Sequence, residues 1–200
     1  GDRLWFCTNR CDVVCLDISR LLSETGQPEV LWKVDMRREL GVVPRAVMIG
    51  SQADHCSIAM FRDLIYVNTT NAAGHNGKVE APQAPSLVCF DKHTGHVRWR
   101  DNSPGEQILD VQQGSPLVIE IAGVGQVVMG QGDGWVRGFD ALTGDMLWKF
   151  DINPKSAEGG FPLGNRNNLA VMPVFHDNRI YFATGKHIEW GVGSGRLCCV

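Results

Sequence analysis

One short element is repeated along the sequence, and this repeat limits the possible folds more than any other feature. Residues 86–99 read SLVCFDKHTGHVRW, and residues 136–148 read VRGFDALTGDMLW. The Asp of the two copies is 49 positions apart, and so is the Trp. Repeats with a period of 20–50 residues are typical of stacked or circular arrays, in which each unit buries its apolar face against the next.

Two further copies flank this pair, the upstream one stretched and the downstream one cut off. The upstream copy has VVCLD at residues 13–17, followed by Thr25-Gly26 and then Trp32. The downstream copy, LCCV at residues 197–200, matches the LVCF of the second copy and stops before its Asp. The sequence therefore predicts four units of one architecture.

Each copy has the pattern of a β-hairpin with a Trp on its second strand. The Asp can hydrogen-bond nearby backbone, and the Gly supplies the left-handed conformation that a tight hairpin requires. A buried Trp removes roughly 150–250 Å² from water, which is worth at most about 4–6 kcal/mol, but a lone hairpin offers no surface to cover it. We therefore expect each Trp to dock one unit on its neighbour. The predicted docking residues are Asp17, Thr25, Gly26, Trp32, Asp91, Thr94, Gly95, Trp99, Asp140, Thr143, Gly144 and Trp148.

The strand pattern predicts an all-β fold, a β-propeller of four-stranded antiparallel blades with tryptophan-docking motifs. The chain supplies 14 expected strands in one propeller segment (1–200), with blades at about 1–35, 55–100, 115–151 and 169–200. The first blade lacks its innermost strand and the last its outermost, so we expect about three and a half blades of a larger ring. The chain is then a piece of a longer propeller, which we favour, or is completed by a partner chain. A short helix over 35–40 is expected to end at Gly41.

Composition excludes several classes of protein. The chain is 44% hydrophobic and 20% charged with a net charge of −3, so nothing in it is basic enough to suggest nucleic acid. No apolar run reaches the 18 residues of a membrane span. Seven cysteines do not form a disulfide scaffold in a chain of this size. Four aligned positions hold only small residues, which indicates close packing; they are Cys15, Cys89, Gly138 and Cys199.

The longest loops all emerge on one face of the predicted propeller, and such loops usually mark the binding face of a repeat array. They cover 35–54, 70–85, 101–114, 152–168 and 185–195. An equally open interpretation is that these are solvated loops without a ligand. The candidate binding residues on this face are His55, His75, Asn76, Arg166, Asn167, Asn168, His187, Glu189 and Trp190.

The Asp-x-x-Thr-Gly-x-x-x-Trp element resembles the docking repeat of PQQ-like β-propellers. That superfamily includes quinoprotein alcohol dehydrogenases and the lipoprotein propeller of outer-membrane barrel assembly. Residues 84–109 and 132–155 are similar to a narrower set of PQQ-binding-like repeat proteins, typical of planctomycete-type bacteria and mostly without an assigned activity. The resemblance implies a bacterial protein of the periplasm or cell envelope.

Two functions remain as hypotheses. The first is a binding or interaction scaffold without a catalytic, cofactor-binding or metal-binding residue, whose partner is a protein, a peptide or the rest of the propeller. The second, implied by the resemblance, is part of a dehydrogenase that uses PQQ and Ca²⁺ to oxidise alcohols or sugars. Some such enzymes stack a disulfide between adjacent cysteines over the cofactor. Cys198 and Cys199 do not fit that role, because neighbouring side chains of a strand point to opposite faces. We favour the scaffold.

Overall fold

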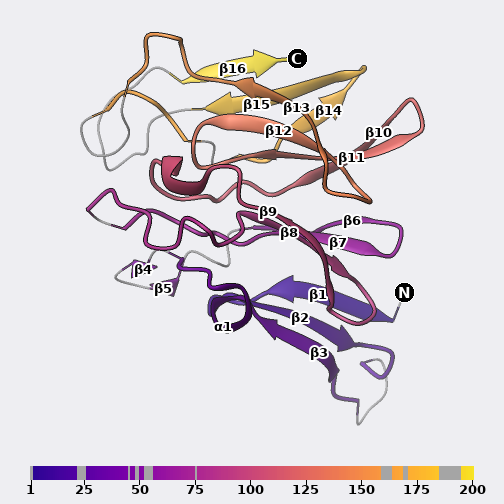
Figure 1. Ribbon diagram of the computed structural model, residues 1–200. Coiled ribbons are helices and arrows are strands. Elements are labelled where there is room, and N and C mark those ends of the chain that lie inside the picture. Colours follow the sequence, from indigo (N-terminus) through magenta and orange to yellow (C-terminus); the bar gives the residue numbers. More distant parts are fainter. Residues whose placement is uncertain are drawn as a thin grey trace.

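Four antiparallel sheets follow one another along the chain and lie side by side in a stack (Figure 1). The computed structural model describes residues 2–21, 26–44, 46–47, 50–51, 56–74, 76–158, 164–168, 171–184 and 195–200. In each sheet the strands pair with their neighbours in sequence. The three interior sheet–sheet contacts are apolar. We call the sheets blades 1 to 4.

The blades contain three, four, four and three strands. Blade 1 consists of β1 (Arg3–Cys7), β2 (Asp12–Asp17) and β3 (Glu29–Asp35). Blade 2 consists of β6 (Ala59–Phe61), β7 (Leu64–Asn68), β8 (Leu87–Asp91) and β9 (Val97–Asp101). Blade 3 consists of β10 (Leu117–Ile121), β11 (Val124–Gly130), β12 (Trp135–Asp140) and β13 (Met146–Asp151). Blade 4 consists of β14 (Val174–His176), β15 (Arg179–Thr184) and β16 (Arg196–Cys199). This arrangement confirms the all-β prediction with four partial or complete propeller blades.

The segment after blade 1 contains the helix that the sequence predicts. The helix α1 (Met36–Leu40) begins at Asp35, whose carboxylate accepts hydrogen bonds from two backbone N–H groups of the first turn, and ends at Gly41 with φ +69°. This cap satisfies donors that the first turn leaves free. Within the described residues, no helix is both long and apolar enough to span a membrane.

Some short elements differ from the expectation. The hairpin of β4 (Ala46–Val47) and β5 (Gly50–Ser51) and a 3₁₀ turn (Gly105–Gln107) lie in segments predicted as loops. Strands β6 and β14 have three residues each. Strands of two or three residues contain too few positions for a period-2 pattern to define their ends.

The register of the strands explains the small residues that the repeats share. Cys15 pairs with Trp32, Cys89 with Trp99, and Gly138 with Trp148. In each pair the strands shift register directly after the small residue. The small side chain leaves room for the indole that lies across the strand from it.

Candidate functional site

Two of the motif tryptophans contact the next blade in the same way. The indole Nε1 of Trp32, in β3, donates a hydrogen bond of 3.1 Å to the carbonyl of Lys92 in blade 2. The indole Nε1 of Trp99, in β9, donates one of 3.0 Å to the carbonyl of Ala141 in blade 3. In both cases the acceptor is the residue that directly follows the motif Asp, so the contact repeats from blade to blade.

The motif glycine lies directly under the indole of the preceding blade. A Cβ built on Gly95 would be 2.7 Å from the ring of Trp32, and one on Gly144 would be 2.6 Å from the ring of Trp99. Both glycines have positive φ, +74° and +80°, a conformation that other residues adopt at a cost. The turn is held by the motif Asp: the Asp140 carboxylate accepts hydrogen bonds from two backbone N–H groups of its own turn.

Each of these carbonyls has a second aromatic donor, which the sequence analysis missed. Trp5 Nε1, in β1, donates to the Lys92 carbonyl at 2.9 Å. The Tyr66 hydroxyl, in β7, donates to the Ala141 carbonyl at 2.9 Å. Trp5 and Tyr66 pair across the strand with Cys15 and Cys89. In the sequence, these second donors could have been found from the aromatic residue that two units share at this position.

The remaining predicted docking residues have different surroundings. Trp148 is half-buried and donates to the side chain of Gln126, in its own blade, at 2.9 Å. Asp17 accepts a backbone hydrogen bond from Ser19 at 2.8 Å, and its hydrogen bonds with Ser19 lower the pKa of the Asp17 carboxyl. Gly26 precedes β3, and Thr25 lies outside the described residues. The docking role of the motif residues stays a prediction.

On the long-loop face, the predicted binding residues that the structure describes make contacts within the protein. Arg166 donates to the Asp151 carboxylate at 3.0 Å. Asn168 donates to the Val111 carbonyl at 2.8 Å, and Asn76 accepts from a backbone N–H two residues later. Asn167 exchanges two backbone hydrogen bonds with the Asn153 side chain. Only the contact between Asn168 and Val111 joins two of the long loops; the others lie within one loop or tie it to the end of β13. His55, His75, His187, Glu189 and Trp190 lie outside the described residues.

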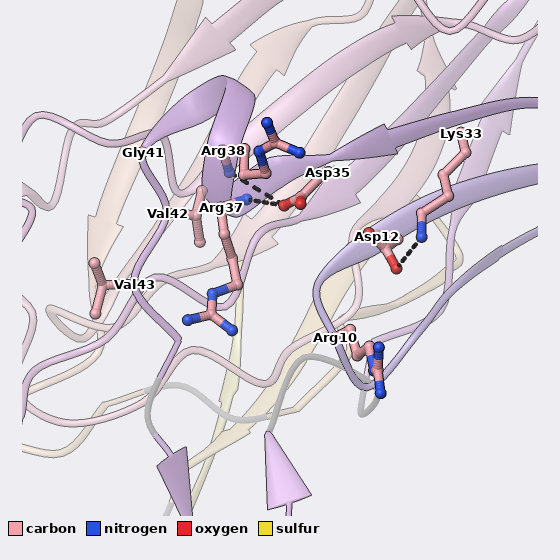
Figure 2. A pocket seen from close by; sticks show the side chains of 9 residues that line it. All are labelled: Arg10, Asp12, Lys33, Asp35, Arg37, Arg38, Gly41, Val42 and Val43. Atoms are coloured by element: carbon pink, nitrogen blue, oxygen red, sulfur yellow. Dashed lines mark hydrogen bonds and ion pairs between the residues drawn. The ribbon is translucent and has the colours of Figure 1, made fainter.

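A basic groove of about 700 Å³ lies on the same face, at the end of blade 1. It lies between the β1–β2 turn, which carries Arg10, and α1, which carries Arg37 and Arg38 (Figure 2). Lys33, in the outer strand β3, is the fourth cationic side chain that lines the groove. Asp12, Asp35, Gly41, Val42 and Val43 form the rest of the lining. We call this site the blade 1 groove.

Both carboxylates of the groove are already engaged. The buried Asp12 forms an ion pair of 2.8 Å with Lys33 and accepts a hydrogen bond from Thr8. Asp35 caps α1 through hydrogen bonds of 3.1 Å from the backbone of Arg37 and Arg38. Within the described residues, the exposed guanidinium groups of Arg10, Arg37 and Arg38 have no carboxylate within ion-pairing distance. The groove therefore has an excess of positive charge in a protein whose net charge is −3.

The groove could not be predicted from the sequence, because its residues come from three separate segments. Arg10 lies in a turn, Lys33 in β3, and Arg37 and Arg38 in a short helix. No run of like charge marks them in the sequence, since acidic residues alternate with them. The available signal was the pair Arg37-Arg38 beside the predicted helix end.

The resemblance implies PQQ and Ca²⁺, and the described residues bear on the Ca²⁺ ligands and on the cysteine pair. Among them, no group of three or more His, Cys, Asp or Glu side chains could hold a metal ion, whereas Ca²⁺ prefers several carboxylate and carbonyl oxygens. Cys198 packs towards blade 3, and Cys199, the next residue of β16, is exposed; both are free thiols.

The stacked antiparallel blades of three or four strands and their repeated indole contacts define a β-propeller protein of the PQQ-like type. The family model described as outer membrane protein assembly factor BamB matches residues 25–198. The chain belongs to this family. A comparison with curated proteins found no match.

Solved structures of the same fold come from larger proteins. They include BamB from Moraxella catarrhalis (TM-score 0.55, 15% identity) and the quinohemoprotein alcohol dehydrogenase ADHIIG from Pseudomonas putida HK5 (0.59, 17%). A third is the quinohemoprotein alcohol dehydrogenase from Comamonas testosteroni (0.58, 18%). Each match covers 92% of this chain but only 40%, 27% and 28%, respectively, of the other chain. At this identity the similarity shows the fold alone.

Proposed function

We propose that this protein is a binding scaffold of the cell envelope that takes an acidic segment of a partner protein in the blade 1 groove. The observation that carries the proposal is the excess of positive charge there. Three guanidinium groups face the groove without an ion-pair partner among the described residues, while both acidic side chains are engaged by Lys33, Thr8 and α1.

The chemistry of the groove suits carboxylates. A guanidinium group binds a carboxylate through two parallel hydrogen bonds, and several such groups can bind successive acidic side chains of an extended peptide. The groove volume of about 700 Å³ exceeds the space that a single small anion needs. The family description, an outer membrane protein assembly factor, supports both a protein partner and an envelope location.

The test is a titration of a fluorescently labelled peptide of alternating Asp and Ser residues, followed by anisotropy. We expect binding that weakens as salt is added, because salt screens exposed charges. Replacement of Arg10, Arg37 and Arg38 together by Gln should raise the dissociation constant at least tenfold.

The matched control removes three charges outside the groove, with Lys78→Gln, Arg98→Gln and Lys149→Gln. This variant should bind within about twofold of the unchanged protein. Equal weakening by both triple variants would show that only net charge matters, and would overturn the groove as the site. Fractionation of the native cells that placed the protein in the cytoplasm would overturn the envelope location.

A further inference from the structure

The residue that follows each motif tryptophan is a cation, and the three cations occupy equivalent positions. They are Lys33, Arg100 and Lys149. Each lies opposite the residue just before the small position of its blade, which is Val14, Val88 or Arg137. Residues directly opposite each other in paired strands lie on one face of the sheet. The three cations therefore lie on equivalent faces, near the long-loop end of the outer strand.

Two of these cations have a partner within their own blade. Lys33 forms an ion pair of 2.8 Å with Asp12 (Figure 2). Lys149 lies over the ring of Trp135, 5.0 Å from its centroid, where the negative face of the aromatic ring attracts a cation. Asp12 begins β2 and Trp135 begins β12, so both partners come from the same position of the repeat.

The third cation, Arg100, lacks such a partner. The equivalent position of blade 2 holds Ser86, whose buried hydroxyl accepts a hydrogen bond of 2.9 Å from Gln112. The adjacent Asp101 is engaged by blade 3, because it accepts a hydrogen bond of 2.8 Å from Gln131. In the part of the chain that the structure describes, no carboxylate lies within ion-pairing distance of the exposed Arg100 guanidinium.

A pocket of about 310 Å³ lies beside this guanidinium group. Gln83, Pro85 and Asn102 form the rest of its lining, so side-chain amides adjoin the cation and no acidic residue does. Asn102 stands where blades 1 and 3 have an acidic residue, Asp35 or Asp151. Guanidinium and amide N–H groups are donors that suit a carboxylate. We call this site the Arg100 pocket.

The Arg100 pocket belongs to the middle of the chain. Val88, opposite Arg100, is buried in the cluster that joins blades 1 and 2, so the pocket lies on the side of blade 2 that faces blade 1. Blade 2 has a neighbouring blade on each side within this chain. The exposure of Arg100 therefore does not depend on where the sequence begins or ends.

One buried side chain joins the Arg100 pocket to the blade 1 groove. The Asn71 amide accepts a hydrogen bond of 3.1 Å from the N–H of Val43, in the groove lining, and donates one of 2.9 Å to the Ala81 carbonyl. Ala81 precedes Gln83 of the pocket by two positions. This path is at most about 20 Å long, which about six residues of an extended peptide span.

We propose that the Arg100 pocket is a second subsite for the acidic segment of the partner, and that it takes one carboxylate while the blade 1 groove holds the others. This proposal rests on the function proposed above and specifies the partner further. The segment continues for about six residues beyond the groove and carries an acidic side chain there. Once the groove is occupied, the second contact is intramolecular, so it adds affinity at little further cost.

The test compares two labelled peptides of alternating Asp and Ser residues by anisotropy. One has about six residues and fits the groove alone, and the other has about fourteen and also reaches the pocket. Arg100→Gln should raise the dissociation constant of the long peptide about threefold, since one exposed ion pair contributes little, and leave that of the short peptide unchanged. Asn102→Asp, which gives Arg100 a carboxylate within the protein, should weaken the long peptide to a similar extent.

The matched control is Arg98→Gln, which removes an exposed arginine of the same strand that already pairs with Asp91 at 3.8 Å. It should leave the affinity for both peptides unchanged, and circular dichroism should show that all variants fold. Equal weakening by Arg98→Gln and Arg100→Gln, or equal weakening of both peptides by Arg100→Gln, would reduce the effect to net charge and overturn the second subsite.

The outcomes also separate this proposal from the one on which it rests. If Arg100→Gln left the long peptide unchanged while the triple groove variant weakened it, the second subsite would be wrong and the groove would stand. If the triple groove variant bound both peptides like the unchanged protein, the proposed function would be wrong, and the role of the Arg100 pocket as its second subsite with it.

Discussion

Trp99 and Trp148 occupy the same position in consecutive blades, but they make different contacts. Trp99 is only 9% exposed, donates to a carbonyl of the next blade, and lies 5.7 Å from the ring of Tyr66 and 6.1 Å from that of Phe139. Trp148 is half-buried and donates to Gln126 of its own blade. The acceptor of Trp99 is the carbonyl of the residue after the motif Asp of blade 3, whereas the described part of blade 4 ends at Val200, before the corresponding Asp.

The largest expected difference in the free energy of unfolding is between Trp99→Ala and Trp148→Ala. Removal of a buried aromatic side chain from a packed contact typically costs about 3–5 kcal/mol, and Trp99 meets that description. Trp148 is half-buried and, among the described residues, donates its hydrogen bond within its own blade, so its removal from this chain should cost at most about half as much. Urea unfolding followed by circular dichroism measures both free energies of unfolding. Equal costs would mean that the contact with the next blade adds nothing to the burial of the ring.

The next effect concerns Gly144, under the ring of Trp99. Ala at this position requires φ near +80° and a Cβ that would lie 2.6 Å from the indole, so we expect a cost of about 2–4 kcal/mol. Gly123 is the matched control, because its φ is +79° but no atom lies within 4 Å of its built Cβ. Gly123→Ala should cost about 1 kcal/mol, from backbone strain alone. If urea unfolding gave both variants the same stability, the close approach of the indole would not matter.

Most of this fold could be predicted because the repeat specifies it several times. Three features of the sequence predict the same hairpins: the Asp-x-x-Thr-Gly turns, the alternation of apolar residues, and the small residue opposite each Trp. When local and global features agree in this way, a fold can be predicted from its sequence. The β4–β5 hairpin and the 3₁₀ turn were missed, because elements of two or three residues leave no periodic pattern.

The candidate site was much less predictable. Loop length identified a face, but on it Arg166, Asn167 and Asn168 make contacts within the protein. The residues of the blade 1 groove come from separate segments, and only the fold places Arg10 across from α1. A sequence shows which side chains carry charge, but not which of them the fold has already paired.

A smaller effect concerns the two donors that share the Ala141 carbonyl. Tyr66→Phe removes one hydrogen bond while Trp99 still satisfies the oxygen, so we expect a loss of about 1 kcal/mol. Trp99→Phe combined with Tyr66→Phe would leave this buried carbonyl without either indole or phenol donor. The double variant should therefore lose about 1 kcal/mol more than the sum of the two single variants, measured as a double-mutant cycle in urea. Additive losses would indicate that the two donors act separately.

The smallest expected effect is a difference in thiol reactivity. Cys89 is buried between blades 2 and 3, whereas Cys199 is exposed in blade 4. Burial raises the pKa of the Cys89 thiol from 9.0 to about 12, so the folded protein keeps it protonated. A thiol reagent at pH 8 should label the exposed Cys199 rapidly and Cys89 only on unfolding, because the thiolate is the reactive form. Mass spectrometry of the labelled peptides measures both rates.

Because the pKa of the Cys89 thiol is raised in the folded protein, the free energy of unfolding should fall as the pH rises. In the unfolded chain the Cys89 thiol ionises near pH 9, whereas in the folded chain it stays protonated until about pH 12. Its contribution to stability is therefore complete below pH 9 and is lost as the pH rises from 9 towards 12. Cys89→Ala should remove this dependence, so the stability difference between the two proteins should shrink or reverse over that range. A difference that stayed constant from pH 7 to pH 11 would show that the Cys89 thiol ionises alike in the folded and unfolded chains, and that the blade 2–blade 3 contact does not shield it from water.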